Sequence, residues 1–77
     1  MDVFAKVKEI IVSELNCDAD KVTPEAKLRD DLGADSIDAV QIVMEVEDSF
    51  GITVDDAEAE SMETVGDVVK YIEKNLK

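Results

Sequence analysis

Three stretches of this chain repeat apolar residues at helical spacing, and this feature limits the possible folds more than any other. They cover residues 3–15, 36–50 and 64–76 of the 77-residue sequence. In each, apolar side chains recur every three or four residues, so they share one face of a helix while most charged residues lie elsewhere. A chain of this length has room for one hydrophobic core. We therefore predict a single all-α domain over residues 1–77 with three main helices.

A short fourth helix is predicted within residues 53–61. Asp55 and Glu58 have the spacing of a capping box, in which two side chains cap the first turn of a helix. The segment holds few large apolar side chains, so little burial would hold it in place. We expect this short helix to be lightly anchored and mobile.

Residues 16–35, between the first two main helices, are predicted to form a long irregular loop. Val22, Leu28 and Leu32 are the apolar residues that would pin it to the core. Residues 23–25, Thr-Pro-Glu, suit one short helical turn with Thr as its cap and Pro in first position. The expected architecture is a small bundle of three main helices plus one short helix, with a long first loop.

The charge of the chain is strongly negative and unevenly placed. Asp and Glu number 20 against 8 Lys and Arg, for a formal net charge of −12. No basic residue lies between Arg29 and Lys70, whereas 13 acidic residues do. Such a surface repels nucleic acid and anionic membranes. It attracts basic protein surfaces, which are the partners we expect.

The residue types needed for independent catalysis are missing. The sequence has no His and one Cys, Cys17, which excludes a Cys–His nucleophile and a structural zinc site within this chain. We predict a non-catalytic protein without a metal site. A single Cys forms no intramolecular disulfide, and no apolar run approaches the ~20 residues that span a bilayer. We therefore expect a cytoplasmic protein with no membrane insertion.

The segment Gly33-Ala34-Asp35-Ser36-Ile37-Asp38 joins a glycine turn to the start of the second helix. A serine at a helix N-terminus suits a bound phosphate, because the free N–H groups and the helix dipole favour an anion. Two interpretations stay open on this evidence. Ser36 is either a simple helix cap or the attachment point of a prosthetic group.

At this point the sequence resembles the acyl carrier proteins of dissociated fatty-acid synthases. The segment around Ser36 matches the attachment motif of that family, and the similarity extends over nearly the whole chain. It includes Val7-Lys8-Glu9-Ile10-Ile11, Asp31-Leu32, Val43-Met44 and Tyr71-Ile72. The resemblance implies a 4'-phosphopantetheine arm on Ser36 that carries acyl groups as thioesters in fatty-acid biosynthesis.

The resemblance also implies two sets of binding residues. Those expected around the acyl chain are Ile42, Val43, Val46, Phe50, Val54, Ala59, Met62, Val68 and Ile72. Those expected to face partner enzymes are Asp35, Ile37, Asp38, Gln41, Met44, Glu47, Asp48, Asp56 and Glu60. The partners implied are a phosphopantetheinyl transferase, acyltransferases and ketosynthases that present basic patches to a monomeric carrier.

Three residues depart from the usual pattern of the family. Ile37 replaces a more common Leu, Gln41 stands where an acid is frequent, and Asp55 stands where a Pro is often found. These changes leave the attachment chemistry intact but bear on partner choice. Two alternatives therefore stay open. One is a carrier of the same fold for polyketide, lipid A, aminoacyl or D-alanyl transfer, and the other is an acidic calcium-binding or adaptor protein without a prosthetic group.

Overall fold

The structure is a computed structural model that describes residues 2–76, and its regular elements are helical throughout this range. This confirms the predicted all-α fold, with three main helices, one short helix and a long first loop. The elements in chain order are α1 (Val3–Leu15), the 3₁₀ turn η1 (Ala19–Lys21), α2 (Ser36–Phe50), α3 (Asp56–Ser61) and α4 (Val65–Asn75). Pairing of the β type within the described residues is limited to one isolated bridge, between Lys27 and Thr64.

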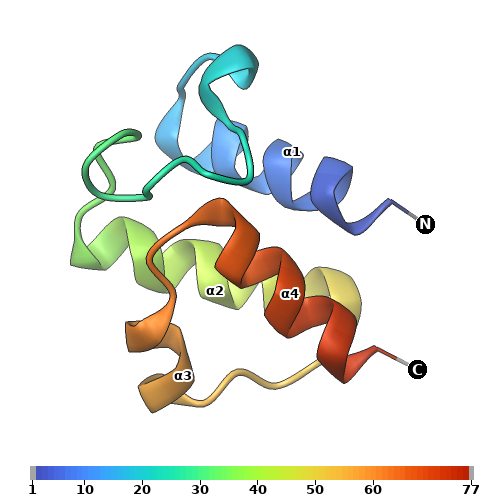
Figure 1. Cartoon of the computed structure of the whole chain (residues 1–77). Coiled ribbons are helices and arrows are strands. Elements are labelled where there is room, and N and C mark those ends of the chain that lie inside the picture. The colour runs from blue at the N-terminus through green and yellow to red at the C-terminus, as the bar shows by residue number, and fades with distance from the viewer. Residues whose placement is uncertain (1, 77) are drawn as a thin grey trace.

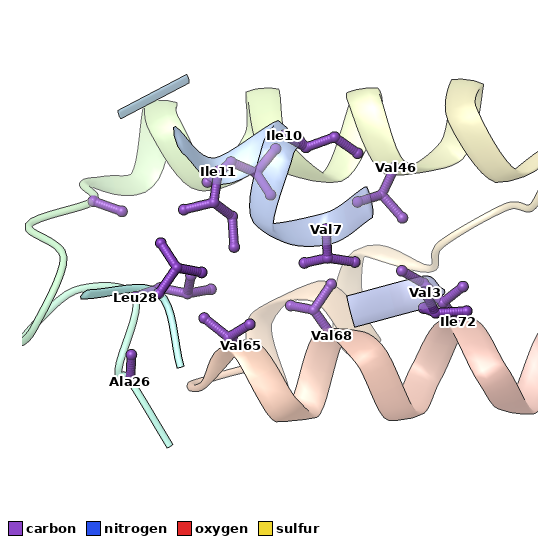
Figure 2. Packing of buried hydrophobic residues seen from close by; sticks show 13 residues of the cluster. Val3, Val7, Ile10, Ile11, Ala26, Leu28, Val46, Val65, Val68 and Ile72 are labelled. Carbon is purple, nitrogen blue, oxygen red and sulfur yellow. The ribbon is translucent and has the colours of Figure 1, made fainter. Parts of the chain in front are cut away.

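The core lies where α1 packs against both α2 and α4. Figure 1 shows α1 running opposite to α2, with the start of α1 and the end of α4 on the same side of the molecule. The side chains of Val7 and Ile11 point from α1 into the space between the other two helices (Figure 2). The largest fully buried side chains are aliphatic: Ile11, Ile42, Ile72, Val7, Val22, Val46 and Val65. The three apolar helix faces predicted from spacing therefore meet in one core.

The ends of the main helices follow local signals in the sequence. At the start of α1, the carboxylate of Asp2 accepts a hydrogen bond of 3.2 Å from the backbone N–H of Ala5, as a helix cap does. Helix α2 ends at Gly51, whose φ of 66° lies in the left-handed region that glycine tolerates best. These two residues mark where α1 begins and where α2 ends.

Helix α4 begins with a complete capping box. The hydroxyl of Thr64 accepts from the backbone N–H of Asp67 at 3.1 Å. In return, the Asp67 carboxylate accepts from the N–H groups of Glu63 and Thr64 at 3.1 and 3.2 Å. These two backbone donors hold the pKa of Asp67 below its ordinary value of 3.8. These bonds make Thr64 the N-cap from which α4 starts.

Helix α3 is held far more loosely than the others, and none of its residues is buried. Figure 1 shows it on the opposite side of α2 and α4 from α1. The helix starts at Asp56, and Asp55 forms no capping hydrogen bond, so the predicted capping box of Asp55 with Glu58 is wrong. The segment before α3 is instead fixed by hydrogen bonds from α2 and α4, which local spacing does not reveal.

The first loop follows the prediction in its anchors but not in its turn. Val22 and Leu28 are buried, and Leu32 is half-buried against the core. The expected helical turn over residues 23–25 is a single hydrogen-bonded turn, closed by the Ala26 N–H and the Thr23 carbonyl at 3.0 Å. The regular helical turn lies earlier, at Ala19–Lys21.

The first loop is also joined to the start of α4 by three backbone hydrogen bonds. Leu28 N–H donates to Glu63 at 2.9 Å, Val65 N–H donates to Ala26 at 3.0 Å, and Gly66 N–H donates to Pro24 at 2.8 Å. Because these bonds link segments almost 40 positions apart, they tie the region before Ser36 to the region after α3.

None of the helices in the described residues has the length and apolar content that a membrane crossing requires.

Candidate site at the start of helix α2

The first turn of α2 is capped by two aspartates that flank Ser36. The Asp35 carboxylate accepts from the backbone N–H of Asp38 at 2.9 Å, and the Asp38 carboxylate accepts from the Asp35 N–H at 3.4 Å. Together the two aspartates form a capping box. Ser36 is therefore the first residue of the helix and not its cap. Its side chain is exposed, so its hydroxyl is free for other chemistry.

The loop before Ser36 is compact and well fixed. The N–H groups of Asp31 and Leu32 both donate to the Lys27 carbonyl, at 2.9 and 3.1 Å. The Ala34 N–H donates to Leu28 at 2.8 Å, and the Ala34 side chain is buried. Two residues before Ser36, the chain is thus anchored in the core, which sets the direction in which Ser36 points outward.

These surroundings fit a phosphodiester on Ser36. The group would lie at the positive end of a 15-residue helix, where backbone N–H groups and the dipole stabilise an anion. An exposed hydroxyl outside the capping box can be esterified without breaking the hydrogen bonds that start α2.

Among residues 2–76 no group of three or more His, Cys, Asp or Glu side chains is arranged to hold a metal ion.

An apolar stripe runs along the exposed side of α2, next to Ser36. The exposed fractions are 71% for Ile37, 56% for Val40 and 52% for Met44. Ile37 and Met44 belong to the set expected to face partner enzymes, and helical spacing aligns them with Gln41 and Asp48. Val40 was missed, although its spacing of three from Ile37 and four from Met44 could have revealed it. Exposed apolar groups of this kind among acids are typical of protein docking surfaces.

The acidic residues expected to face partners are not all free. Asp38 and Glu47 are half-buried, and each accepts a backbone hydrogen bond. The Glu47 carboxylate accepts from the N–H of Val54, in the loop before α3, at 2.9 Å. The other polar members of the predicted set are exposed: Asp35, Gln41, Asp48, Asp56 and Glu60. Glu47 therefore lies on the expected face and also holds the loop that leads to α3.

A small cavity of about 30 Å³ lies between α2, α3 and α4. Its walls are almost entirely apolar, and its size suits one or two water-sized groups, so a longer chain requires the helices to separate. The lining residues are Leu28, Ala39, Ile42, Val43, Val46, Val54, Ala59, Met62, Val68, Tyr71 and Ile72. Eight of the nine residues expected around an acyl chain are in this set.

The ninth residue, Phe50, lies outside the lining of this cavity, and its contact with an acyl chain stays a prediction. It shares the inner face of α2 with Val46, but it lies one turn, or ~6 Å, further along the helix. There it packs half-buried against the core. Three lining residues were not in the predicted set. Ala39 lies on α2 itself, whereas the approach of Leu28 and Tyr71 to α2 depends on how the loop and α4 fold back.

Comparison with known proteins agrees with this geometry. Residues 5–72 match the family model described as a phosphopantetheine attachment site. The acyl carrier protein of Thermotoga maritima is 57% identical over 75 residues, which cover 97% of this chain and 93% of that protein. The solved structure of the acyl carrier protein from Enterococcus faecalis superposes with a TM-score of 0.82 at 44% identity. It covers 96% of this chain and 94% of its own.

Proposed function

The chain belongs to the acyl carrier proteins of the phosphopantetheine-attachment family, and we propose that Ser36 is the residue that carries the prosthetic group. The protein is a non-catalytic carrier of fatty-acid biosynthesis with covalently attached 4'-phosphopantetheine. The terminal thiol of this group supplies the point at which acyl groups are bound as thioesters. Family membership replaces the alternative of an acidic calcium-binding or adaptor protein without a prosthetic group.

One observation supports Ser36 in particular. Asp35 and Asp38 perform the capping of α2, which leaves the Ser36 hydroxyl exposed at the positive end of the helix. The buried Ala34 holds this end of α2 against the core, so the attachment point is fixed while the attached arm is free to move. A transferase therefore meets a serine whose modification costs the fold little.

The protein acts together with the enzymes of fatty-acid synthesis. In our proposal, their basic patches dock on the acidic side of α2, around the stripe of Ile37, Val40 and Met44. The 13 acidic residues between Arg29 and Lys70, with no base among them, support this choice. The phosphopantetheinyl transferase, acyltransferases and ketosynthases would share this surface. We also propose that the chain is one carrier domain that works as a cytoplasmic monomer.

The cavity between α2, α3 and α4 is the proposed shelter for the acyl chain. Its largely apolar lining suits methylene groups, each of which gains about 0.8 kcal/mol on leaving water. Helix α3, with no buried residue, is the wall that can move to enlarge it. The chain's own residues thus exclude water from the cargo until an enzyme takes it.

Intact mass spectrometry tests the attachment site. The protein is incubated with coenzyme A and a phosphopantetheinyl transferase, and we expect the wild type to gain the mass of one phosphopantetheine. Ser36→Ala should gain none. Ser49→Ala removes another exposed serine of α2 and should be modified like the wild type. Equal modification of Ser36→Ala and the wild type would overturn the assignment.

A further inference from the structure

Two side chains hold the segment that leads into α3. From α2, the Glu47 carboxylate accepts a hydrogen bond of 2.9 Å from the backbone N–H of Val54. From α4, the Tyr71 hydroxyl donates to the carbonyl of Thr53 at 3.2 Å. The two bonds hold neighbouring residues, one from α2 and the other from α4. They therefore fix the start of α3, which has no side-chain cap of its own.

The same segment forms part of the cavity wall. The Val54 side chain is 8% exposed and lines the cavity, as does Tyr71. At its far end, α3 continues into residues tied to the first loop, where the Leu28 N–H donates to Glu63 at 2.9 Å. The end of α3 is therefore held by backbone hydrogen bonds. Its start is held by side chains, whose polar groups can also bind other molecules.

Glu47 also belongs to the side of α2 that carries the exposed apolar stripe. It follows Met44 by three residues and precedes the exposed Asp48. No basic residue lies between Arg29 and Lys70 in the sequence, so the neighbours of Glu47 on α2 include acids but no base. A cation that approaches this side of α2 is therefore attracted to Glu47 together with the exposed Asp48.

We propose that Glu47 is a latch that couples the acidic side of α2 to the cavity. A basic side chain that pairs with its carboxylate weakens the hydrogen bond to the Val54 N–H and frees the start of α3. The physical reason is that a carboxylate is a stronger acceptor than a neutral group, and a paired cation reduces this advantage. The inference rests on the proposed function, and it makes Glu47 a positioning residue for cavity opening.

Amide hydrogen exchange at Val54, followed by NMR on the full chain, tests this role with a lysine tetrapeptide as the basic probe. In the wild type at low salt, we expect the peptide to speed exchange about tenfold, as when a charge-assisted hydrogen bond loses half its strength. A serine tetrapeptide of equal length should have no effect.

Three variants separate the charge of Glu47 from its hydrogen bond. Glu47→Gln keeps an acceptor without the charge, so Val54 exchange should already be about tenfold faster than in the wild type and should stop responding to the lysine peptide. Glu47→Ala removes the acceptor, so exchange should be fast without peptide. Asp48→Asn removes one charge from the same side of α2 but not the latch, and its response should match the wild type.

Two results would overturn the latch. One is a lysine peptide that shifts the α2 signals, or fails to bind, while Val54 exchange in the wild type stays unchanged. The other is an equal response in Glu47→Gln and the wild type. Neither result touches the modification of Ser36, which intact mass measures separately, so failure of the latch and failure of the proposed function are distinguishable.

Discussion

At the scale of single residues, Asp35 caps helix α2 and Ser36 offers a free hydroxyl, although a single serine could take the cap position itself. A serine that caps a helix uses its oxygen to accept a backbone N–H. Here Asp35 accepts that bond at 2.9 Å, and Ser36 follows it as an exposed first residue. The hydroxyl can therefore be esterified while α2 keeps its cap.

Gly66 is a residue whose small size the fold requires. A Cβ at this position would lie 2.8 Å from the backbone oxygen of Pro24, to which the Gly66 N–H donates. We expect Gly66→Ala to lower the free energy of unfolding by about 1–3 kcal/mol, because a rigid backbone oxygen has to shift. Urea denaturation measures this loss.

Gly33→Ala is the matched comparison for this prediction. Gly33 has a φ of 74°, and nothing lies within 4 Å of an added Cβ. Its cost should come from the left-handed backbone alone, at about 1 kcal/mol. A Gly66→Ala variant as stable as the wild type would show that the contact with Pro24 does not constrain the loop.

The residue-level predictions succeeded where the information was local. Helical spacing accounts for the exposure of Ile37 and Met44, since 100° per residue determines on which side of α2 they lie. Spacing could not show that the Glu47 carboxylate reaches the Val54 N–H, because that contact depends on how the chain returns after Gly51. The roles of Ser36 and of the partner-facing residues stay predictions.

At the scale of elements, the cap of α4 should make stability depend on pH through Asp67. Its carboxylate has a lowered pKa in the folded state, so its contribution is present above the unfolded value and is lost as the pH falls through the folded one. At neutral pH we expect Asp67→Asn to be less stable than the wild type by about 1 kcal/mol. This difference should shrink below pH 3.8.

Urea denaturation between neutral pH and pH 3 measures this difference, with Glu73→Gln as the control. Glu73 is an exposed acid in the last turn of α4 and has no part in the capping box at its start. The free energy of unfolding of each variant is subtracted from that of the wild type at the same pH. This difference cancels the general effect of protonating the acidic surface. A stability difference for Asp67→Asn that stays constant down to pH 3 would contradict the role of the charge.

The cavity gives a second element-level prediction, at Ala59 on the inner side of α3. Ala59→Leu adds apolar volume to the cavity wall, so it should compete with a bound acyl chain. We expect octanoyl loading to raise the melting temperature of the wild type. The free energy of unfolding should rise by about 2 kcal/mol if three methylenes are buried at ~0.8 kcal/mol each. The gain should be clearly smaller in Ala59→Leu.

Thermal unfolding of loaded and unloaded protein checks this prediction, with Ala57→Leu as control. Ala57 is exposed on α3 and does not line the cavity, so its loaded form should gain as much as the wild type. An equal gain in Ala59→Leu and the wild type would place the acyl chain elsewhere.

The helices could be predicted from the sequence, whereas their connections could not. The period of the apolar residues and the capping signals at Thr64 and Gly51 placed the main helices nearly to the residue. The bridge between Lys27 and Thr64 could not be predicted from the residues around either position. Every residue except proline has the same backbone N–H and carbonyl groups, so the side chains do not indicate which segments pair. Helix α3 lies within the predicted range, but the side-chain contacts from Glu47 and Tyr71 that hold its start have no local signal either.

At the scale of the whole molecule, the net charge of −12 works against the compact fold. Like charges on one side of a small domain repel, and salt screens this repulsion. We expect the melting temperature to rise by about 5 °C, which is ~1 kcal/mol for a domain of this size. This rise should appear between about 10 mM and 150 mM salt, where the Debye length falls from ~30 to ~8 Å.

Calorimetry at the two salt concentrations measures this effect. Asp48→Asn and Asp56→Asn each remove an exposed charge without an assigned hydrogen bond, so a double variant should respond less to salt. A melting temperature that is independent of salt in the wild type would contradict the repulsion. The same charge that lowers stability also draws basic partners, so the two effects should weaken together as acids are removed.

The location of the added group is the most direct test of the whole account. After reaction with coenzyme A and a transferase, the protein is digested and its peptides are fragmented in a mass spectrometer. We predict that phosphopantetheine is found on the peptide that contains Gly33 to Asp38, with the mass step at Ser36. A modification mapped to Ser13, Ser49 or Ser61, or none at all, would contradict the claim that the start of α2 is the tether point.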